Sequence, residues 1–383
     1  GLTNIGNVVG YEKDAEGNTI PVHGRLYYRG YEITDLTRGF QAEGRHGFEE
    51  ISYLLLAGKL PTKEELAEFD AIIKVEQELP FSLSKNLILS LRGRNIMNML
   101  ARTVLGLYTL DKDAEDYSPE NLVKQSISLI ARFPVIVAYA YFAMRHSFQR
   151  RSMVIRHPRP DLSLAANFLY MLKGDKFTAL EAEILDLALV LHAEHGGGNN
   201  STFTTRVVSS AQTDTYSSIA AALGSLKGEL HGGANMKVIG MMNDIKQNVK
   251  DWKDEAEVEA YLQKLLRKEG YDHSGKIYGI GHAIYTLSDP RCVLLKEKAG
   301  ALAKEAGMED EFNLYQAVER LAPEAFYKFK GGQRKTIAAN VDFYSGFVYK
   351  CIGLPEELYT PIFAIARVPG WAAHRIEEVT SSS

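Results

Sequence analysis

The chain has 383 residues, of which 45% are hydrophobic and 24% are charged. This composition is ordinary for a globular protein, and the length suffices for one large domain with a smaller one, or for two domains of ordinary size. The formal net charge of −4 excludes the strongly basic domain that is expected when nucleic acid is the main partner. An anionic small molecule stays compatible with this charge, because it needs only a local basic pocket.

The cysteines and the apolar stretches indicate the compartment. Cys292 and Cys351 are too few for a disulfide framework, so a reducing compartment is expected. The most apolar stretch, residues 129–144, contains Arg132 and Pro134 and is shorter than the roughly 20 apolar residues that span a bilayer. The N-terminus lacks the basic and apolar regions of a signal peptide. We therefore expect a cytoplasmic protein with no membrane partner.

A short β-hairpin is predicted in the first thirty residues. Residues 7–11 and 24–28 have a strand-like pattern, and they flank the turn-rich cluster 14–18. No comparable pattern follows, so the rest of the chain is predicted to be helical.

Several helix starts carry recognisable capping signals. Thr62 and Glu65 follow the capping-box pattern, in which a Thr at the N-cap precedes a Glu by three residues. Thr178 and Glu181 repeat this pattern. The sequence therefore predicts a mainly α-helical fold.

Three further helices can be described in more detail. Pro119 after a serine marks a helix start, and Pro134 is expected to kink or end that helix. Residues 184–191 are too apolar for a surface helix, so this helix is predicted to be buried. Residues 217–226 are rich in Ala, Ser and Gly, which let helix backbones approach closely and suit a central or interface helix.

The stretch from His192 to Asn200 combines two histidines with three glycines at the end of the predicted buried helix. Glycines end helices and let a ligand approach the backbone closely. His192 and His195 are three residues apart and share a helix face, as paired metal ligands do. A buried, hydrogen-bonded histidine without any metal explains the same residues, and the sequence leaves both interpretations open.

His231 begins the motif His-Gly-Gly-Ala-Asn, directly before a predicted helix. The positive end of a helix dipole disfavours imidazolium, so a histidine there tends to stay neutral. A neutral histidine can donate a hydrogen bond to a developing enolate. A loop histidine without a function is the alternative.

The stretch from Tyr278 to Tyr285 contains two glycines and His282, and Arg291 follows closely. Glycines here would let a backbone loop wrap around a nucleotide, although a Gly-x-Gly motif alone is weak evidence for phosphate binding. Arg291 is suited to hold a carboxylate through two parallel hydrogen bonds.

Asp342 lies among apolar and aromatic residues in the stretch 340–346. Partial burial would raise its pKa and strengthen it as a base, whereas the alternative is a helix-capping role. Together, the four stretches supply histidines, one such carboxylate and arginines. This set suits proton abstraction next to a carbonyl group, with anionic substrates.

Four motifs resemble the citrate synthase family in order and spacing: His195-Gly-Gly-Gly-Asn199, His231-Gly-Gly-Ala-Asn235, Gly-Ile-Gly-His282 with Asp-Pro-Arg291, and Asn-Val-Asp342. The resemblance covers nearly the whole chain. It implies a mainly helical homodimer with a large and a small helical domain in each subunit. The large domain would comprise residues 1–233 and 351–383. The small domain would comprise residues 234–350 and form the CoA side of the active-site cleft.

The resemblance also implies an activity, that of a citrate (Si)-synthase. This acyltransferase of the tricarboxylic acid cycle condenses acetyl-CoA with oxaloacetate and water, through an enol intermediate, to give citrate and CoA. Asp342 would take a proton from the acetyl methyl group, His231 would stabilise the enol, and His282 would polarise the oxaloacetate ketone. Four residues would hold oxaloacetate (His195, Asn199, Arg291 and Arg367), and four would meet the CoA nucleotide (Tyr278, Gly279, Ile280 and Gly281). The resemblance implies no metal and no permanently bound cofactor.

The sequence departs from the family pattern in one place near the expected CoA site. Thr286 stands where family members often carry a basic residue.

Three alternative functions stay open. The first is a 2-methylcitrate synthase, which has the same fold and chemistry but uses propionyl-CoA. A metal-dependent hydrolase built on His192 and His195 would need a third ligand, and a catalytically silent helical scaffold would need the histidines and the aspartate to be scattered in space.

Overall fold

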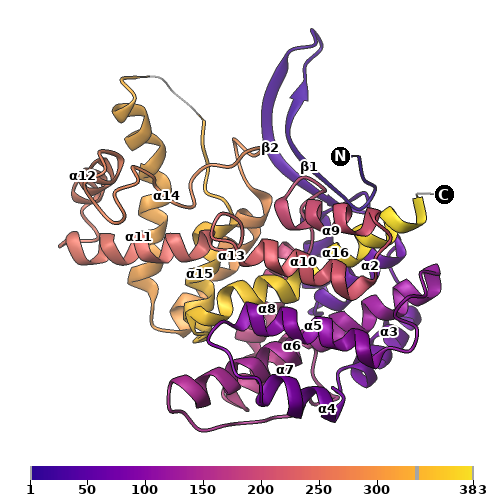
Figure 1. Ribbon diagram of the computed structural model, residues 1–383. Coiled ribbons are helices and arrows are strands. Elements are labelled where there is room, and N and C mark those ends of the chain that lie inside the picture. Colours follow the sequence, from indigo (N-terminus) through magenta and orange to yellow (C-terminus); the bar gives the residue numbers. More distant parts are fainter. Residues whose placement is uncertain (1, 333–335, 382–383) are drawn as a thin grey trace. The chain divides into compact units, whose positions relative to one another are not determined.

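The computed structural model describes residues 2–332 and 336–381. The described residues form mainly helices, with a small group of strands near the N-terminus (Figure 1). This confirms the predicted fold class. Both predicted capping boxes are present, one at the start of α3 (Lys63–Glu76) and one at the start of α8 (Ala179–His192).

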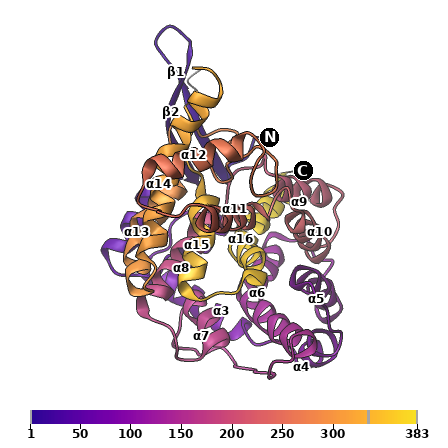
Figure 2. The same ribbon diagram turned by 90° about the vertical axis from the view of Figure 1, so that its left-hand side faces the viewer.

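The predicted hairpin is confirmed. Strands β1 (Gly6–Lys13), β2 (Thr19–Tyr28) and β3 (Tyr31–Glu32) form one sheet in this order. Strands β1 and β2 run side by side along a long hairpin in both views (Figures 1 and 2). At its turn, the Asp14 carboxylate accepts hydrogen bonds from the backbone N–H groups of Glu16 and Asn18, at 2.9 and 2.8 Å.

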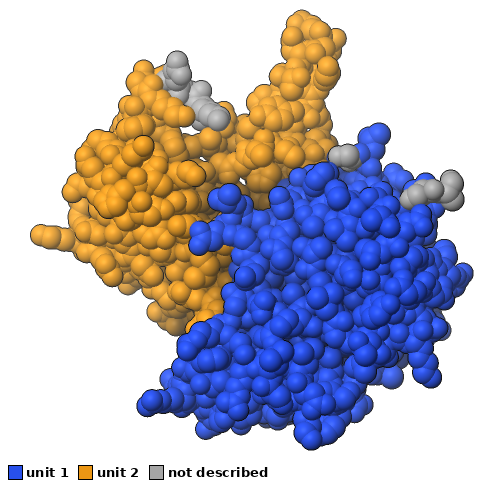
Figure 3. Space-filling model, viewed as in Figure 1, with its two compact units in different colours: residues 1–7, 27–232, 360–383 blue, residues 8–26, 233–359 orange. Residues whose placement is uncertain are grey.

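Residue contacts divide the chain into two compact units, which Figure 3 colours separately. Unit 1 comprises residues 1–7, 27–232 and 360–383, and unit 2 comprises residues 8–26 and 233–359. Most of the hairpin therefore belongs to unit 2. The domain boundaries implied by the resemblance stay a prediction.

Unit 1 contains the buried helix α8 (Ala179–His192), whose apolar residues face neighbours on nearly all sides, as predicted. The small-residue helix α10 packs against both α9 and α5. The other helices of this unit are α1 (Ile33–Ala42), α2 (Phe48–Ala57), α3 (Lys63–Glu76), α4 (Phe81–Leu83), the π-helix η1 (Ser84–Leu89), α5 (Ile96–Leu110), α6 (Pro119–Phe148), α7 (Leu164–Lys173), α9 (Asn200–Ser210), α10 (Thr215–Lys227) and α16 (Tyr359–Ser381).

The course of helix α6 overturns one of the two alternatives expected at Pro134, the end of the helix. It begins at the Ser118 cap as predicted, but it continues through Pro134 to Phe148 instead of ending at the proline. Among the described residues, α6 is the one helix long and apolar enough to cross a membrane by length and composition. However, 83% of its most apolar 18-residue window is buried inside the protein. Core packing on all sides therefore accounts for its apolar character and offsets the hydrogen bond that Pro134 removes.

Unit 2 is built from two groups of packed helices. Helix α12 lies against α14, and α15 lies against α11 and α13; Figure 2 shows α12 and α14 next to each other. The elements of this unit are α11 (Ala234–Asn248), α12 (Glu255–Leu266), α13 (Pro290–Glu305), α14 (Glu309–Phe329), α15 (Val341–Ile352) and the short 3-10 helix η2 (Glu356–Leu358).

Candidate active site

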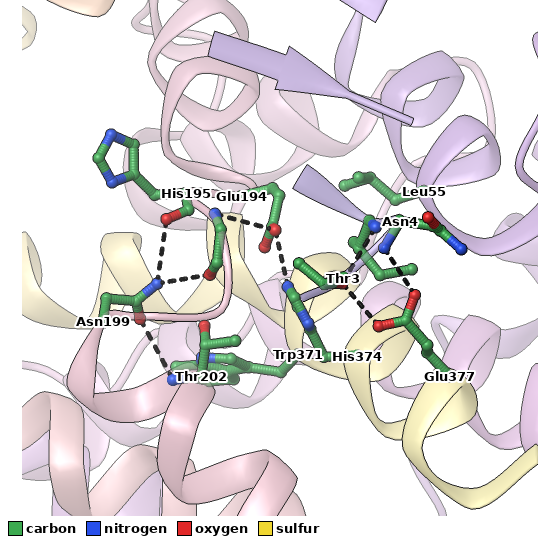
Figure 4. A network of polar contacts seen from close by, with 12 residues as sticks. Thr3, Asn4, Leu55, Glu194, His195, Asn199, Thr202, Trp371, His374 and Glu377 are labelled. Carbon is green, nitrogen blue, oxygen red and sulfur yellow. Dashed lines mark hydrogen bonds and ion pairs between the residues drawn. The ribbon is translucent and has the colours of Figure 1, made fainter. Parts of the chain in front are cut away.

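The turn between α8 and α9 in unit 1 carries His195 and Asn199 (Figure 4). Asn199 is the N-cap of α9, and its Oδ1 accepts a hydrogen bond from the Thr202 N–H at 3.2 Å. The Asn199 amide nitrogen donates back to the carbonyl oxygens of His195 and Gly196, at 3.4 and 3.0 Å. The capping residue therefore also closes the turn that presents His195.

Arg367 on α16 binds both ends of this turn. Its Nε donates to the His192 carbonyl oxygen at 2.7 Å, and its Nη1 donates to Asn199 Oδ1 at 3.3 Å. Its guanidinium lies 4.9 Å from the centre of the Phe363 ring, and the side chain is almost fully buried. The structure thus brings together three residues that the sequence analysis assigned to oxaloacetate binding: His195, Asn199 and Arg367.

His231 joins this group within unit 1. Its ring lies 5.9 Å from the Phe363 ring, which also contacts Arg367. Burial first, and then the Arg367 charge, lower the pKa of His231 to about 4. His231 is therefore neutral near pH 7.

The hydrogen-bond partners of His231 define its tautomer. The Ser201 N–H, in the first turn of α9, points to His231 Nε2 at 3.4 Å, and Ser201 Oγ lies 2.7 Å from the same atom. Such N–H groups have no partner within their own helix. Because Nε2 accepts, the hydrogen of the neutral ring lies on Nδ1. The sequence analysis expected His231 to meet the N-terminus of the following helix, α11, but its ring nitrogen contacts the N-terminus of α9.

In unit 2, the backbone next to His282 fixes the ring. The N–H groups of Ile284 and Tyr285 donate to His282 Nδ1 at 3.0 and 3.1 Å. The Tyr285 ring also lies against the imidazole, with 4.6 Å between the ring centres. Burial first, and then the Arg291 charge, lower the pKa of His282 to about 4. The ring is thus neutral near pH 7, with its hydrogen on Nε2.

Arg291 forms a buried ion pair with Asp289. Its Nε and Nη2 donate to the two carboxylate oxygens of Asp289, at 3.1 and 2.9 Å. Burial alone would lower the pKa of Arg291. The Asp289 carboxylate raises this pKa by more than burial lowers it, so the guanidinium stays charged. Asp289 Oδ2 also accepts the Val341 N–H at 3.1 Å, which joins the starts of α13 and α15. The Nε and Nη2 edge of the Arg291 guanidinium therefore binds Asp289.

Asp342 lies half-buried in the first turn of α15. The alternative of a capping role is wrong, because Asn340 is the N-cap and its Oδ1 accepts the Asp342 N–H at 2.9 Å. The negative charge of Asp342 contributes to the raised pKa of Arg291. The structure thus brings His282, Arg291 and Asp342 together within unit 2.

The loop from Tyr278 to Gly281 is joined to the residues before α15. Asn340 Nδ2 donates to the Gly281 carbonyl oxygen at 2.8 Å, and the Asn340 N–H donates to the Gly279 carbonyl oxygen at 2.9 Å. Ile280 forms an isolated β-bridge with Ala339. Gly279 has φ +80, and a Cβ there would lie 2.9 Å from Phe343, so only glycine fits without displacement. Asn340 therefore binds both the expected CoA loop and the first turn of α15, which carries Asp342.

The metal-binding alternative lacks ligands. His192 is buried, and its Nδ1 lies 2.7 Å from the Ala188 carbonyl oxygen. Among residues 2–332 and 336–381, no group of three His, Cys, Asp or Glu side chains is arranged to hold a metal ion. The third ligand that a site on His192 and His195 would require is thus not found there.

Several residues that orient the site were not predicted from the sequence. Ser201 and Phe363 contact His231, but they lie 30 and 132 positions away from it in the sequence, and no motif links them. Asp289 and Tyr285 stood inside recognised motifs, yet their contacts to Arg291 and His282 were not predicted. For Asp289, its spacing of two residues before Arg291 at a helix start was an available signal.

The geometry agrees with the comparisons to known proteins. The family model "Citrate synthase, C-terminal domain" matches residues 2–383. A citrate synthase of Deinococcus radiodurans is 40% identical over 86% of this chain and 81% of its own length. A 2-methylcitrate synthase of Shewanella oneidensis is 35% identical over 94% of this chain and 87% of its own length.

A solved structure is also similar. It is the ternary complex of a Thermoplasma acidophilum citrate synthase with carboxymethyl coenzyme A and oxaloacetate. The two chains are 28% identical, the TM-score is 0.78, and the match covers 100% of this chain and 90% of that one. The chain therefore belongs to the citrate synthase family of enzymes, as its motifs indicated.

Proposed function

We propose that the protein condenses acetyl-CoA with oxaloacetate and water to give citrate and CoA, a reaction of the tricarboxylic acid cycle. The observation that carries this proposal is a pair of half-buried neutral histidines, His231 and His282, together with the half-buried carboxylate of Asp342. The backbone N–H groups of Ile284 and Tyr285 donate to Nδ1 of His282, and the Ser201 N–H donates to Nε2 of His231, so the ring hydrogens lie on Nε2 of His282 and on Nδ1 of His231. Neutral donors and a carboxylate base are the groups that an enol intermediate requires.

The proposed mechanism assigns one step to each group. Asp342 takes a proton from the acetyl methyl group, and the thioester oxygen that gains electron density accepts the Nδ1–H of His231. The enol carbon then attacks the ketone carbon of oxaloacetate, and His282 supplies a proton from Nε2 to the ketone oxygen. The proton that Asp342 took from the methyl group then replaces the one that His282 gave, so both side chains return to their starting states. Water hydrolyses the resulting thioester and releases CoA. His231 belongs to unit 1, whereas His282 and Asp342 belong to unit 2.

Oxaloacetate is a dianion, and we assign its carboxylates to Arg291 and Arg367, with His195 and Asn199 as further hydrogen-bonding groups. Both arginines are buried, so their charges are poorly screened by water. Arg291 keeps unused N–H groups beside its Asp289 pair, and charge-assisted hydrogen bonds are the strong ones.

The loop of Tyr278, Gly279, Ile280 and Gly281 is the proposed contact for the CoA nucleotide. Its two glycines have φ values of +80 and +102, a conformation that favours glycine, and a Cβ at Gly281 would meet nothing within 4 Å, so a ligand can approach the loop closely there. Lys237 lies 5.9 Å from the centre of the Tyr278 ring and adds a positive charge near this loop.

A homodimer is the proposed assembly. Helices α5 and α9, which both pack on α10, expose large apolar side chains: Leu105 and Tyr108 on α5, and Phe203 and Val207 on α9. Exposed apolar side chains gathered on neighbouring helices are typical of an interaction surface, and α10 adds small residues that allow close packing. Sedimentation at working concentration is expected to give a dimer, and a monomer under those conditions would contradict this assignment.

The central experiment measures product formation by the purified protein. With acetyl-CoA and oxaloacetate, free CoA thiol and citrate should form in equal amounts. Acetyl-CoA alone should release almost no CoA, because water attacks only after condensation. Rapid CoA release without oxaloacetate would instead indicate a thioesterase and overturn the proposal.

The second candidate is a 2-methylcitrate synthase that uses propionyl-CoA. The Shewanella oneidensis relative of that name, with 35% identity over 94% of this chain, favours keeping it as a candidate. The two candidates differ in kcat/KM for acetyl-CoA and propionyl-CoA, measured side by side with saturating oxaloacetate. A higher value for propionyl-CoA would replace the first assignment by the second.

A further inference from the structure

A second polar network lies beside the His195 turn in unit 1, and the proposed mechanism does not use it (Figure 4). Glu194 is fully buried, and its Oε2 lies 2.7 Å from Nε2 of His374, which is also fully buried, on α16. The same carboxylate oxygen accepts the Gly196 N–H at 3.0 Å. A buried carboxylate therefore contacts both the turn and the helix that carries Arg367.

Arg206 on α9 decides which partner donates in the Glu194–His374 pair. Its Nη1 lies 3.0 Å from His374 Nδ1, and a guanidinium can only donate. His374 Nδ1 is thus an acceptor, and Nε2 carries the hydrogen and donates it to the Glu194 carboxylate. Arg206 in turn pairs with Glu377 and Glu378 near the end of α16, at 2.8 and 3.1 Å.

Packing leaves the Glu194 side chain little freedom to move. A Cβ at Gly6 would lie 2.3 Å from Glu194 Oε2, and one at Gly370 would lie 2.9 Å from Glu194 Oε1. The N-terminal segment is also tied down, because Thr3 Oγ1 and the Asn4 N–H donate to Glu377 at 2.6 and 2.9 Å. Two glycine contacts and a hydrogen-bonded segment thus enclose the carboxylate.

We propose that Glu194 and His374 act as a positioning pair for oxaloacetate binding, an inference that rests on the proposed function. The Glu194 carboxylate accepts the Gly196 N–H, and the Gly196 carbonyl oxygen accepts a hydrogen bond from the Asn199 side-chain amide at 3.0 Å. Asn199 Oδ1 in turn accepts from Arg367. A continuous series of hydrogen bonds therefore joins His374 to the arginine assigned to a substrate carboxylate.

The physical reason for a positioning role is the cost of a buried charge. A buried carboxylate becomes strongly unfavourable when it loses a hydrogen-bond donor. Without the His374 donor, the turn would therefore shift until Glu194 found another donor or a water molecule. Such a shift would displace His195 and Asn199. A misplacement of about 1 Å can cost roughly 10²-fold in rate.

The first test replaces His374 in the full-length protein. His374→Leu removes the donor, and it should raise KM for oxaloacetate by about 10–100-fold, while KM for acetyl-CoA stays within about 3-fold. His374→Gln can both donate to Glu194 and accept from Arg206, so it should restore KM for oxaloacetate to within about 5-fold of wild type. A structural role alone would lower the melting temperature and leave both KM values unchanged, and this result would overturn the proposal.

The second test avoids the buried position, in case His374→Leu does not fold. Arg206 is only 20% exposed but lies at the surface end of the network. Arg206→Leu removes the hydrogen bond that holds His374 Nδ1 (3.0 Å), so the ring that donates to Glu194 is less well oriented, and KM for oxaloacetate should rise about 5-fold or more. Lys173→Met is the matched control, because Lys173 is 23% exposed and also pairs with a glutamate in unit 1.

The two variants distinguish the inference from the proposed function. Wild-type protein without condensation activity would refute the proposed function itself. Active wild-type protein with equal oxaloacetate KM values for Arg206→Leu and Lys173→Met would refute only the positioning pair.

Discussion

The histidine and the arginine that the proposed mechanism uses in each unit are held in place in opposite ways: His231 and Arg367 in unit 1, and His282 and Arg291 in unit 2. In unit 2, His282, Arg291 and Asp342 are each fixed by a residue two or three positions away in the sequence: Tyr285, Asp289 and Asn340. In unit 1, Arg367 is fixed by His192 and Asn199, which lie 175 and 168 positions away. The same kind of chemistry thus rests on local contacts in one unit and on long-range packing in the other.

The two histidines show what this difference means. Both have their pKa lowered to about 4, chiefly by burial, yet their hydrogens lie on different ring nitrogens. The backbone of its own loop sets the tautomer of His282, whereas the first turn of a separate helix sets that of His231. Local fixation tolerates changes elsewhere in the fold, and long-range fixation couples the site to the whole unit.

The largest expected effect comes from Asp342→Asn. Asparagine keeps the shape of the side chain but cannot accept the methyl proton, so kcat should fall by roughly 10²–10⁴-fold. The melting temperature should change little, because Asn340 and not Asp342 caps α15. The variant should also stop exchanging the acetyl methyl protons with deuterated solvent when a non-reactive oxaloacetate analogue is bound. A near wild-type rate would reassign the base.

Removal of the two hydrogen-bond donors is expected to have the next largest effect. His231→Ala and His282→Ala should each lower kcat by about 10²–10³-fold, the usual cost of losing a donor to a developing oxyanion. Methyl proton exchange separates them, because His231 acts before condensation and His282 acts during it. Exchange should be lost in His231→Ala and retained in His282→Ala. Equal loss in both would contradict the division of roles.

The arginines test local against long-range fixation directly. Arg291→Leu and Arg367→Leu should each weaken oxaloacetate binding by about 10–100-fold, because each removes charge-assisted hydrogen bonds of roughly 1.5–3 kcal/mol. Stability should separate the two variants. Arg291→Leu leaves Asp289 buried without its guanidinium, which costs about 3–5 kcal/mol, whereas Arg367→Leu takes the donor from two neutral acceptors, His192 O and Asn199 Oδ1, at about 1–3 kcal/mol.

Calorimetry with oxaloacetate and thermal melting are the measurements for this pair of variants. CoA binding serves as the control, and it should weaken far less than oxaloacetate binding. Loss of both affinities in parallel would indicate a general folding defect. An equal fall in melting temperature for the two variants would show that the Asp289 pair contributes no more than the Arg367 contacts do.

The contrast between the units also explains what could be predicted from the sequence. The helices, the hairpin and both capping boxes depend on local patterns, and they were predicted correctly. The Asn340 cap beside Asp342 was equally local, but the sequence analysis weighed Asp342 itself as the cap. Ser201 and Phe363 could not be found, because only tertiary packing brings them to His231. The continuation of α6 past Pro134 likewise depends on the core that surrounds it.

The last expected effect is a change in the pH dependence of stability. His231 and His282 have an ordinary pKa of 6.5 that folding lowers to about 4. Below about pH 6.5, the unfolded chain therefore takes up protons that the folded protein does not, and stability is lost as the pH falls toward 4. Below that range the folded histidines also become protonated, and the loss stops.

Two buried carboxylates change stability in the opposite direction. Burial raises the pKa of Glu49 to about 8 and that of Asp186 to about 7, so their contribution is lost as the pH rises through these values. The wild-type curve is the sum of both effects, and a double variant isolates the histidines. His231→Gln combined with His282→Gln keeps polar side chains that do not titrate. Its melting temperature, relative to wild type, should rise steadily from about pH 7 to about pH 4.5, because only wild type loses stability through these two rings. Melting curves that stay parallel over this range would show that the two histidines are already protonated in the folded protein, and the tautomers on which the comparison of the two units rests would then be wrong.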